Sequence, residues 1–389
     1  MKSKNFILTV IVLAQFCCTS IWFASNAVMG NLISNYNLKA TALGDLTSAV
    51  QFGFISGTLF FAIFMISDRF SPSKVFGVSA IFAALFNTAL ILDINTFSSL
   101  ISLRFLAGFA LAGIYPVGMK IAADYFPKTL GLALGFLVGA LVLGTSFPLL
   151  LKGTSLGLSW TQTIIGTSTL SVLGGMLIFF LIKDGPYRKV GKKLNLKAFF
   201  TIFKNNPFRA AAFGYFGHMW ELYAFWAFVP VIISYNLTDE TYNIGMLSFF
   251  VIAIGSIACV IGGFISQKIG LYKTARYSLM ASMACCLTCP FILLYAPFAL
   301  RIVFLLVWGM FVISDSPMFS SLVASNTSPE IKGSALTIVN CIGFAITIIS
   351  IQLLSFLTTT FDSPFVYMIL GLGGVFGLVS IRSNGLVQT

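Results

Sequence analysis

The sequence predicts an all-α membrane protein with twelve transmembrane helices in two pseudo-symmetric six-helix bundles. Three observations lead to this fold class. First, 58% of the 389 residues are hydrophobic and only 9% are charged, whereas soluble domains carry about 25% charged residues. Second, many apolar runs reach the roughly 20 residues that a helix needs to cross a bilayer. Third, short motifs of the first half of the chain return in the second half.

The apolar runs define the expected helices in chain order. They cover residues 6–29, 44–66, 74–93, 98–120, 130–151, 160–182, 208–233, 243–265, 274–295, 299–323, 333–357 and 363–381. Most gaps between them are short and contain turn residues, as at 35–37 and 71–73. The longest gap is basic and separates two sets of six runs. We therefore expect an N-terminal bundle over 1–183, a cytoplasmic linker over 184–207 and a C-terminal bundle over 208–389.

The basic residues follow the pattern expected of membrane topology. Lys and Arg are enriched in cytoplasmic loops. With the N-terminus inside, most of the 23 Lys and Arg residues fall on the cytoplasmic side, and only Lys39, Lys152 and Arg301 fall on the outer side. The net charge of +12 is thus explained without nucleic acid as a partner. We expect both termini in the cytoplasm, and a bacterial inner membrane as the location.

The start of the chain resembles a signal peptide only superficially. The apolar run over 6–29 is longer than the apolar core of a signal peptide, and no clear A-x-A-like cleavage site accompanies it. It is therefore interpreted as the first spanning helix.

The residue types required for enzymatic or metal chemistry are not arranged for it. The seven cysteines lie inside apolar runs, without zinc-site spacing and without a neighbouring histidine. The sequence has no evident nucleophile–base pair and no phosphate-binding loop of the kind that ATP-driven pumps carry. We expect no enzyme activity, no metal and no cofactor.

The two halves repeat each other. Residues 67–74, after the second run, correspond to 266–273, after the eighth, and Tyr115-Pro116 in the fourth run corresponds to Ser316-Pro317 in the tenth. The copies lie about 200 residues apart, and such internal repeats are typical of secondary transporters, whose binding site lies between the repeats near the membrane midplane.

These features together resemble the major facilitator superfamily along the whole chain. The family's loop after helix 2 reads G-x-x-x-D-R-x-G-R-[RK]; here Asp68 and Arg69 match, but both glycines are replaced. The second copy of this loop keeps Lys268 and has Gln267 in place of the acid. The resemblance implies a gate in which Asp68, Arg69 and Lys268 hold the halves together on the cytoplasmic side. The departures predict a weaker gate.

Two further motifs bear on the mechanism. The sequence from Arg104 to Gly108, RFLAG, is similar to the family's R-x-x-q-G, whose arginine is linked to proton coupling in several members. The G-P-x-x-G-G motif of drug/proton antiporters is missing from the fifth run, which has Gly139 to Gly144, GALVLG, instead. The resemblance therefore implies a monomeric transporter that works by alternating access, and the missing motif favours import.

Four ionisable residues fall within the predicted spans: Arg104, His218, Glu221 and Asp315. A charge at the bilayer centre costs about 3 kcal/mol, so such residues usually face the bundle interior and serve a function. His218 and Glu221 share one helical face because they are three residues apart. We predict that these four residues couple transport to protons, with Arg104 paired to Glu221, Asp315 or an anionic substrate.

Each of the four residues also has a structural alternative. Glu221 and His218 can form hydrogen bonds that only join helices, with a Tyr or Trp and with a backbone carbonyl. Asp315 can cap the helix break expected beside Pro317. Arg104 can extend its side chain to the membrane interface, as we expect for Lys120 at the inner end of the same run.

The resemblance also implies a substrate site, because helices 1, 4, 7 and 10 line the central cavity in this family. The polar and aromatic residues of these runs suit a small polar or amphipathic organic solute or anion. The predicted substrate-binding residues are Gln15, Asn26, Arg104, Tyr115, His218, Trp220, Glu221 and Asp315.

The leading prediction is a secondary transporter that carries a small organic solute or anion together with protons, embedded in a lipid bilayer. Two alternatives stay open. One is a proton-coupled exporter or antiporter of drugs or metabolites. The other is a substrate sensor on the same scaffold, which would bind without flux.

Overall fold

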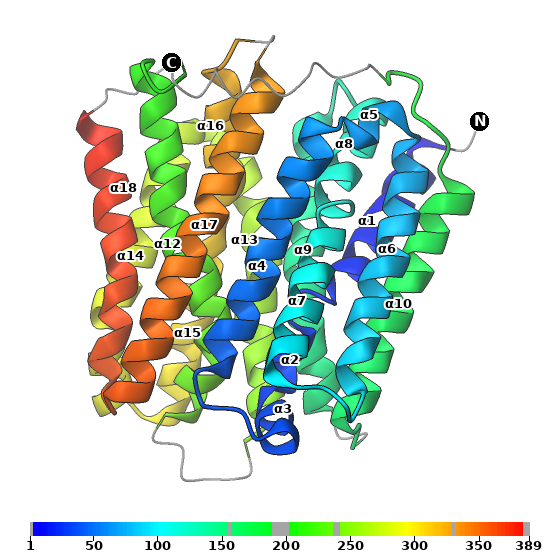
Figure 1. Ribbon diagram of the computed structural model, residues 1–389. Coiled ribbons are helices and arrows are strands. Elements are labelled where there is room, and N and C mark those ends of the chain that lie inside the picture. Colours follow the sequence, from blue (N-terminus) through cyan, green and yellow to red (C-terminus); the bar gives the residue numbers. More distant parts are fainter. Residues whose placement is uncertain (1–2, 155–156, 189–201, 236–241, 329–330, 384–389) are drawn as a thin grey trace. The chain divides into compact units, whose positions relative to one another are not determined.

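The computed structural model describes residues 3–154, 157–188, 202–235, 242–328 and 331–383 (Figure 1). The described residues form helices and no β-strand. They separate into two compact units, Met1–Lys193 (unit 1) and Leu194–Thr389 (unit 2). Most of the expected basic linker lies outside the described residues.

The helices of unit 1 follow the first six expected runs, with additional short elements. They are α1 (Lys4–Thr19), α2 (Ala24–Ala27), α3 (Met29–Tyr36), α4 (Ala42–Ile63), α5 (Ile66–Arg69), α6 (Pro72–Thr88), η1 (Ala89–Ile91), α7 (Phe97–Leu111), α8 (Tyr115–Tyr125), α9 (Leu130–Gly153) and α10 (Trp160–Leu181).

The helices of unit 2 follow the last six expected runs. They are α12 (Asn206–Ser234), α13 (Ile244–Ile269), α14 (Leu271–Tyr295), α15 (Phe298–Ser314), α16 (Ser316–Ser325), α17 (Lys332–Thr360), η2 (Pro364–Leu370) and α18 (Gly371–Ser383).

Eleven stretches of the described chain are long and apolar enough to cross a membrane. The twelfth expected span, residues 6–29, is divided: α1 ends at Thr19, and the chain continues through the short α2 and α3. The divisions fall at Phe23 and Val28, whose backbone angles lie outside the helical region. The first expected span is therefore helical but interrupted. Apolar residues fill the whole stretch, and the predicted all-α transmembrane fold is confirmed.

Local sequence explains where several helices begin and end. Thr96 and Ser159 accept hydrogen bonds from the backbone N–H groups of Ser99 and Gln162, whose side chains accept in return. These reciprocal bonds satisfy donors that the first turn of a helix leaves free. Gly270 separates α13 from α14 with φ +90°, a conformation that side chains rarely adopt.

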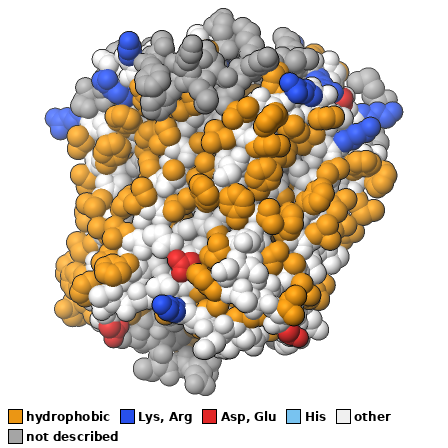
Figure 2. Space-filling view, in the orientation of Figure 1, with side chains coloured by type: hydrophobic (Ala, Val, Ile, Leu, Met, Phe, Trp, Pro, Cys, Tyr) orange, Lys and Arg blue, Asp and Glu red, His pale blue; other side chains and the backbone are white. Residues whose placement is uncertain are grey.

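Some helix surfaces expose large hydrophobic side chains, as surfaces in contact with lipid do, and others pack closely against a neighbouring helix. Large hydrophobic side chains such as Phe180 and Phe264 are 69% and 57% exposed, and hydrophobic side chains dominate the middle of the face in Figure 2. Inside unit 1, a Cβ atom on Gly53 or Gly108 would collide with the backbone of the facing helix, α7 or α4. Such small residues permit the close helix contact that replaces the hydrophobic effect in lipid.

Helix α12 is the most buried spanning stretch of the described chain. Within its apolar segment 83% of the residues are buried, against 39% to 61% in the other ten stretches. It packs against α13, α15, α16, α17 and α18 of unit 2, among which it lies in Figure 1. Polar residues at the middle of α12 therefore lie inside the unit and away from lipid.

Candidate functional site

The centre of α12 brings the one histidine of the chain to a carboxylate. His218 Nδ1 lies 2.8 Å from Asp315 Oδ1, and both side chains are 1% exposed. Asp315 lies where α15 ends and α16 begins, followed by Pro317 in the first turn of α16. This separation is that of an ion pair, although Asp315 Oδ1 accepts no hydrogen bond among the described residues.

The carboxylate of Asp315 faces His218 and does not cap the helix break. Its side chain makes no capping hydrogen bond to α16, although its backbone carbonyl accepts from Phe319 N at 2.9 Å. The alternative in which Asp315 serves as a local cap is therefore wrong. The break instead holds the residue at a fixed point between two helical segments.

Glu221 lies one turn after His218 and uses a different set of partners. Its Oε1 accepts from Trp308 Nε1 at 2.6 Å and from the hydroxyl of Ser282, and the Cys286 thiol also hydrogen bonds to it. All three donors are neutral, and the side chain is 1% exposed. Among the described residues, no Lys, Arg or His forms an ion pair with Glu221.

The expected relay between His218 and Glu221 is not among the hydrogen bonds of the described residues. Each side chain turns to another helix: His218 to the α15–α16 junction, Glu221 to α14 and α15. The structural alternative for Glu221, a hydrogen bond with a Tyr or Trp of another helix, is confirmed by Trp308. Sequence reasoning missed Ser282, whose only signal was a hydroxyl in the middle of an apolar run, which is common in membrane helices.

Arg104 is completely buried in unit 1, with 0% exposure. It donates from Nη1 to the carbonyl of Ile21 at 3.3 Å and from Nη2 to the carbonyl of Trp22 at 2.5 Å. These carbonyls lie between α1 and α2, where the helix is interrupted; the carbonyl of Ile21 also accepts from Ala24 N at 3.3 Å. The alternative in which Arg104 extends to the membrane interface is wrong.

The remaining predicted substrate-binding residues, Gln15, Asn26 and Tyr115, lie in unit 1. Asn26 Nδ2 donates to Thr47 Oγ1 at 2.8 Å. Gln15 is 0% exposed, and neither atom of its amide has a hydrogen-bond partner among the described residues. Tyr115 begins α8 and is half-buried. The prediction that these residues bind substrate is not tested by these contacts.

Trp220 lies on the opposite side of α12 from His218, because two residues correspond to about 200° of helical rotation. Its indole Nε1 donates to the carbonyl of Ile369 at 3.0 Å. The indole thus joins α12 to η2 inside unit 2.

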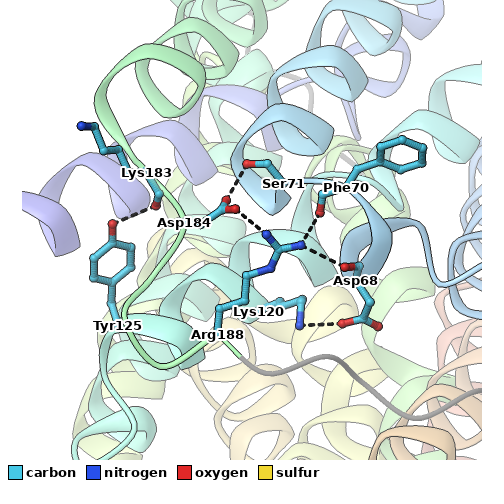
Figure 3. A network of polar contacts seen from close by, with 8 residues as sticks. All are labelled: Asp68, Phe70, Ser71, Lys120, Tyr125, Lys183, Asp184 and Arg188. Atoms are coloured by element: carbon cyan, nitrogen blue, oxygen red, sulfur yellow. Dashed lines mark hydrogen bonds and ion pairs between the residues drawn. The ribbon is translucent and has the colours of Figure 1, made fainter.

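One of the predicted gating residues, Asp68, lies in a polar network at one end of unit 1 (Figure 3). Asp68 forms an ion pair of 2.8 Å with Lys120. Arg188 donates from Nη2 to the carbonyls of Asp68 and Phe70, at 2.9 and 2.8 Å. Lys120 therefore does not simply extend to the interface, as the sequence suggested, but holds the acid of the family motif.

Asp184 completes this network, and the sequence pattern alone did not indicate it. It pairs with Arg188 four residues later and accepts from Ser71 Oγ at 2.5 Å. Arg69 and Lys268 have exposed side chains. The network attaches the chain that follows α10 to the loop between α5 and α6.

Metal ligands do not gather in the part of the chain that the structure describes: no group of three His, Cys, Asp or Glu side chains has the arrangement of a metal site.

Comparison with solved structures places this fold among membrane transporters. The chain is similar to a bacterial homologue of the human lysosomal transporter Spinster, inward-facing and unoccupied, with TM-score 0.69, 14% identity and coverage of 98% of this chain and 96% of that chain. It is similar to the nucleoside transporter NupG, with TM-score 0.74, 14% identity and coverage of 97% of this chain and 99% of that chain. It is also similar to the partially occluded, inward-open xylose transporter XylE from E. coli, with TM-score 0.77, 14% identity and coverage of 97% of this chain and 96% of that chain.

At this level of identity, structural similarity establishes the fold alone. No curated protein matches the sequence significantly. The sequence profile of the Major Facilitator Superfamily, however, matches residues 11–351. The chain therefore belongs to the Major Facilitator Superfamily, whose members are transporters and not enzymes.

Proposed function

We propose that this transporter carries a small organic solute or anion together with protons, in the same direction, by alternating access. The observation that carries the proposal is the buried pair of His218 and Asp315 at the centre of α12, 2.8 Å apart. Glu221, one turn away, adds a second buried carboxyl to the same unit.

The chemistry of the pair suits proton exchange. An imidazole is the side chain whose charge changes most readily near neutral pH. A neutral imidazole beside an ionised carboxylate carries one negative charge, and one added proton makes the pair neutral overall. A charge in a bilayer interior is costly. This change of one unit of charge therefore shifts the equilibrium between transporter conformations that bury the pair to different degrees.

Glu221 is proposed as a second titratable site with Asp315. Three neutral donors surround its carboxyl group, so it can hold its position whether ionised or protonated. Asp315 lies close enough for the two carboxyls to interact electrostatically. Protonation of one carboxyl then favours ionisation of the other, which links the two sites.

The proposed membrane topology is based on the positions of the basic residues. The Lys and Arg residues concentrate in the gaps that face one side, in agreement with cytoplasmic termini. We place the protein in a bacterial inner membrane, where a proton gradient is available as the driving force, and we expect a monomer.

Proton-driven uptake can be measured directly in proteoliposomes. The purified protein is first screened by thermal shift against a metabolite panel at about pH 5.5 and about pH 7.5, since a ligand stabilises the folded state that binds it. Each hit is then supplied as labelled solute outside vesicles that contain a pH-sensitive dye. Symport predicts that solute addition acidifies the vesicle interior.

The other possible results have distinct meanings. Alkalinisation of the interior during solute entry indicates an antiporter. Solute entry without proton movement indicates a uniporter, and binding without solute entry indicates a sensor. Each of these three results contradicts the proposal.

A further inference from the structure

His218 has one ring nitrogen that the protein uses and one that it does not. Nδ1 contacts Asp315, whereas Nε2 has no hydrogen-bond partner among the described residues, although the side chain is 1% exposed. Buried polar atoms in proteins almost always have a partner, and an exception indicates a role in binding or chemistry. The unused nitrogen of a pair fixed at 2.8 Å therefore needs an explanation.

The neighbouring carboxylate favours one position for the ring proton. A carboxylate oxygen repels the lone pair of a nitrogen 2.8 Å away, so we expect the neutral imidazole to carry its proton on Nδ1. Nε2 then carries a lone pair. When the ring gains a second proton, Nε2 becomes an N–H donor. The same atom thus repels an anion in one charge state and binds it in the other.

Unit 2 offers no other buried cation for an anion. Within its described residues, His218 is the only buried side chain that can be positive, since the other Lys and Arg residues are exposed or partly exposed. Glu221 already accepts its bonds from Ser282 and Trp308. An anion bound inside this unit would therefore depend on Nε2.

Further ionisable groups face the pair from neighbouring elements. The Tyr215 ring lies 5.9 Å from the imidazole, and the Cys259 thiol of α13 donates to the carbonyl of Ile313, near Asp315. Glu221 on α12 and Cys286 on α14 form the adjacent group.

The elements on the other sides contribute few ionisable groups. Helix α17 carries Cys341 and η2 carries Tyr367, while α16 has none and the Arg382 side chain of α18 is exposed. Among the described residues, none of these groups is a buried acid or base that competes with Asp315 for the imidazole.

We propose that Nε2 of His218 binds the carboxylate of a small organic acid, and that this nitrogen carries the proton that accompanies the acid. The inference rests on the proposed function and names its substrate class. Entry of one carboxylate with one proton leaves the charge of the His218–Asp315 pair and its ligand unchanged. A carboxylate alone would add a second negative charge beside Asp315, and a dianion would require a second proton that the ring has no free nitrogen to hold.

The first test uses the fact that the chain contains one histidine. The protein is produced with ¹⁵N-labelled histidine and purified through a tag without histidine, so both ring nitrogens give single NMR signals. We expect the neutral ring to carry its proton on Nδ1 and the second proton to enter on Nε2. A neutral ring protonated at Nε2, or a ring that does not titrate, contradicts the proposal without any knowledge of the substrate.

The second test identifies the ligand class. Acetate, lactate, succinate and benzoate are each compared with the corresponding amide, by the shift of the Nε2 signal and by binding affinity. We expect at least one carboxylate, and not its amide, to bind. Its apparent Kd should rise by up to about tenfold per pH unit above the titration midpoint of Nε2, because one proton is linked to binding. Equal binding of acid and amide, or no signal change with any carboxylate, contradicts the proposal.

Two variants of the same residue separate the roles of its nitrogens. In His218→Asn the amide nitrogen reaches the position of Nδ1, so we expect the Asp315 contact to stay and carboxylate binding to weaken at least about tenfold, the value of one lost hydrogen bond to a charged group. In His218→Gln the amide reaches the position of Nε2 and donates at every pH. Binding should persist without its pH slope.

The results also separate this inference from the proposed function. Carboxylate binding with the expected slope, but without flux in vesicles, would leave the site intact and disprove the transport proposal. Proton-coupled flux with unchanged carboxylate binding in His218→Asn would support the transport proposal and disprove the role of Nε2.

Discussion

Unit 1 and unit 2 both bury an ionic side chain beside an interrupted spanning helix, but only one of the two charges can change. Arg104 lies against the interruption between α1 and α2 and donates to the carbonyls of Ile21 and Trp22. Asp315 lies at the interruption between α15 and α16 and contacts His218. The guanidinium of Arg104 keeps its proton under all physiological conditions, whereas we propose that the imidazole–carboxylate pair gains and loses one.

The difference suggests a division of roles between the halves of a pseudo-symmetric protein. In unit 1 the charge completes the hydrogen bonding of a broken helix, which is a structural role. In unit 2 the charge pair is held in place by the helix break and by α12, the most buried spanning stretch. The family resemblance alone would assign Arg104 to proton coupling, whereas its contacts favour the structural role.

Removing the acid of the pair should have the largest effect. For symport with one proton, an inward gradient of two pH units supports about 100-fold solute accumulation, because one unit corresponds to 1.36 kcal/mol. We expect Asp315→Asn to reduce accumulation to unity, since the variant side chain cannot balance an imidazolium. Labelled solute in proteoliposomes measures this effect. Accumulation at the parent level would show that the pair is not the coupling site.

A control distinguishes lost coupling from lost folding. Equilibrium exchange of solute across the same vesicles needs no proton gradient. If Asp315→Asn still exchanges solute, the protein is folded and only its coupling is lost.

Glu221→Gln should have the next largest effect and leave the fold intact. The variant amide oxygen can still accept from Trp308 and Ser282, so we expect thermal stability close to that of the parent. The initial rate of uptake, which each linked proton can change by at most about tenfold per pH unit, should depend less steeply on pH and keep the part that His218 contributes. Uptake rates between about pH 5.5 and 7.5 measure this change, and an unchanged pH dependence would show that Glu221 is structural.

Arg104→Lys tests the structural half of the comparison. Lysine keeps the charge but cannot direct a planar fork of donors at two carbonyls. A buried acceptor left without its partner costs about 1–3 kcal/mol, so we expect a lower unfolding temperature and an unchanged pH profile of uptake. A shifted pH profile at full stability would place Arg104 in the coupling mechanism and remove the contrast between the units.

The positions of the helices could be predicted from sequence, whereas the contacts of the site could not. Apolar runs of about 20 residues are required by the bilayer itself, so they mark the spans without knowledge of the fold. The interruption of the first helix left no comparable signal, because the residue that satisfies its carbonyls, Arg104, lies 83 and 82 positions away.

The same limit explains the partners of Glu221 and His218. Burial of both could be predicted from their place in an apolar run, and the shared helical face suggested a direct contact. The actual donors to Glu221, Ser282 and Trp308, lie 61 and 87 positions away. Which of several polar residues meet depends on the rotation of each helix in the bundle, and apolar runs without a strong polar face do not specify that rotation.

The smallest effect is expected at the polar network in Figure 3, where the ion pairs are partly exposed. The side chains of Arg188 and Asp184 are 24% and 36% exposed, and pairs of this kind contribute about 0–1 kcal/mol. Arg188 also donates to the carbonyls of Asp68 and Phe70. We therefore expect Arg188→Ala to lower the unfolding temperature slightly and to leave the pH profile of uptake unchanged.

Arg69→Ala is the matched control, because Arg69 belongs to the same end of unit 1 and its side chain is exposed. If the network stabilises unit 1 through Arg188, the control should change the unfolding temperature less than Arg188→Ala does. If instead the family's gate depends on Arg69, the control should alter the uptake rate with no loss of stability. Equal and negligible effects of both variants would assign neither role to this network, and the functional charges of the protein would then be confined to its buried interior.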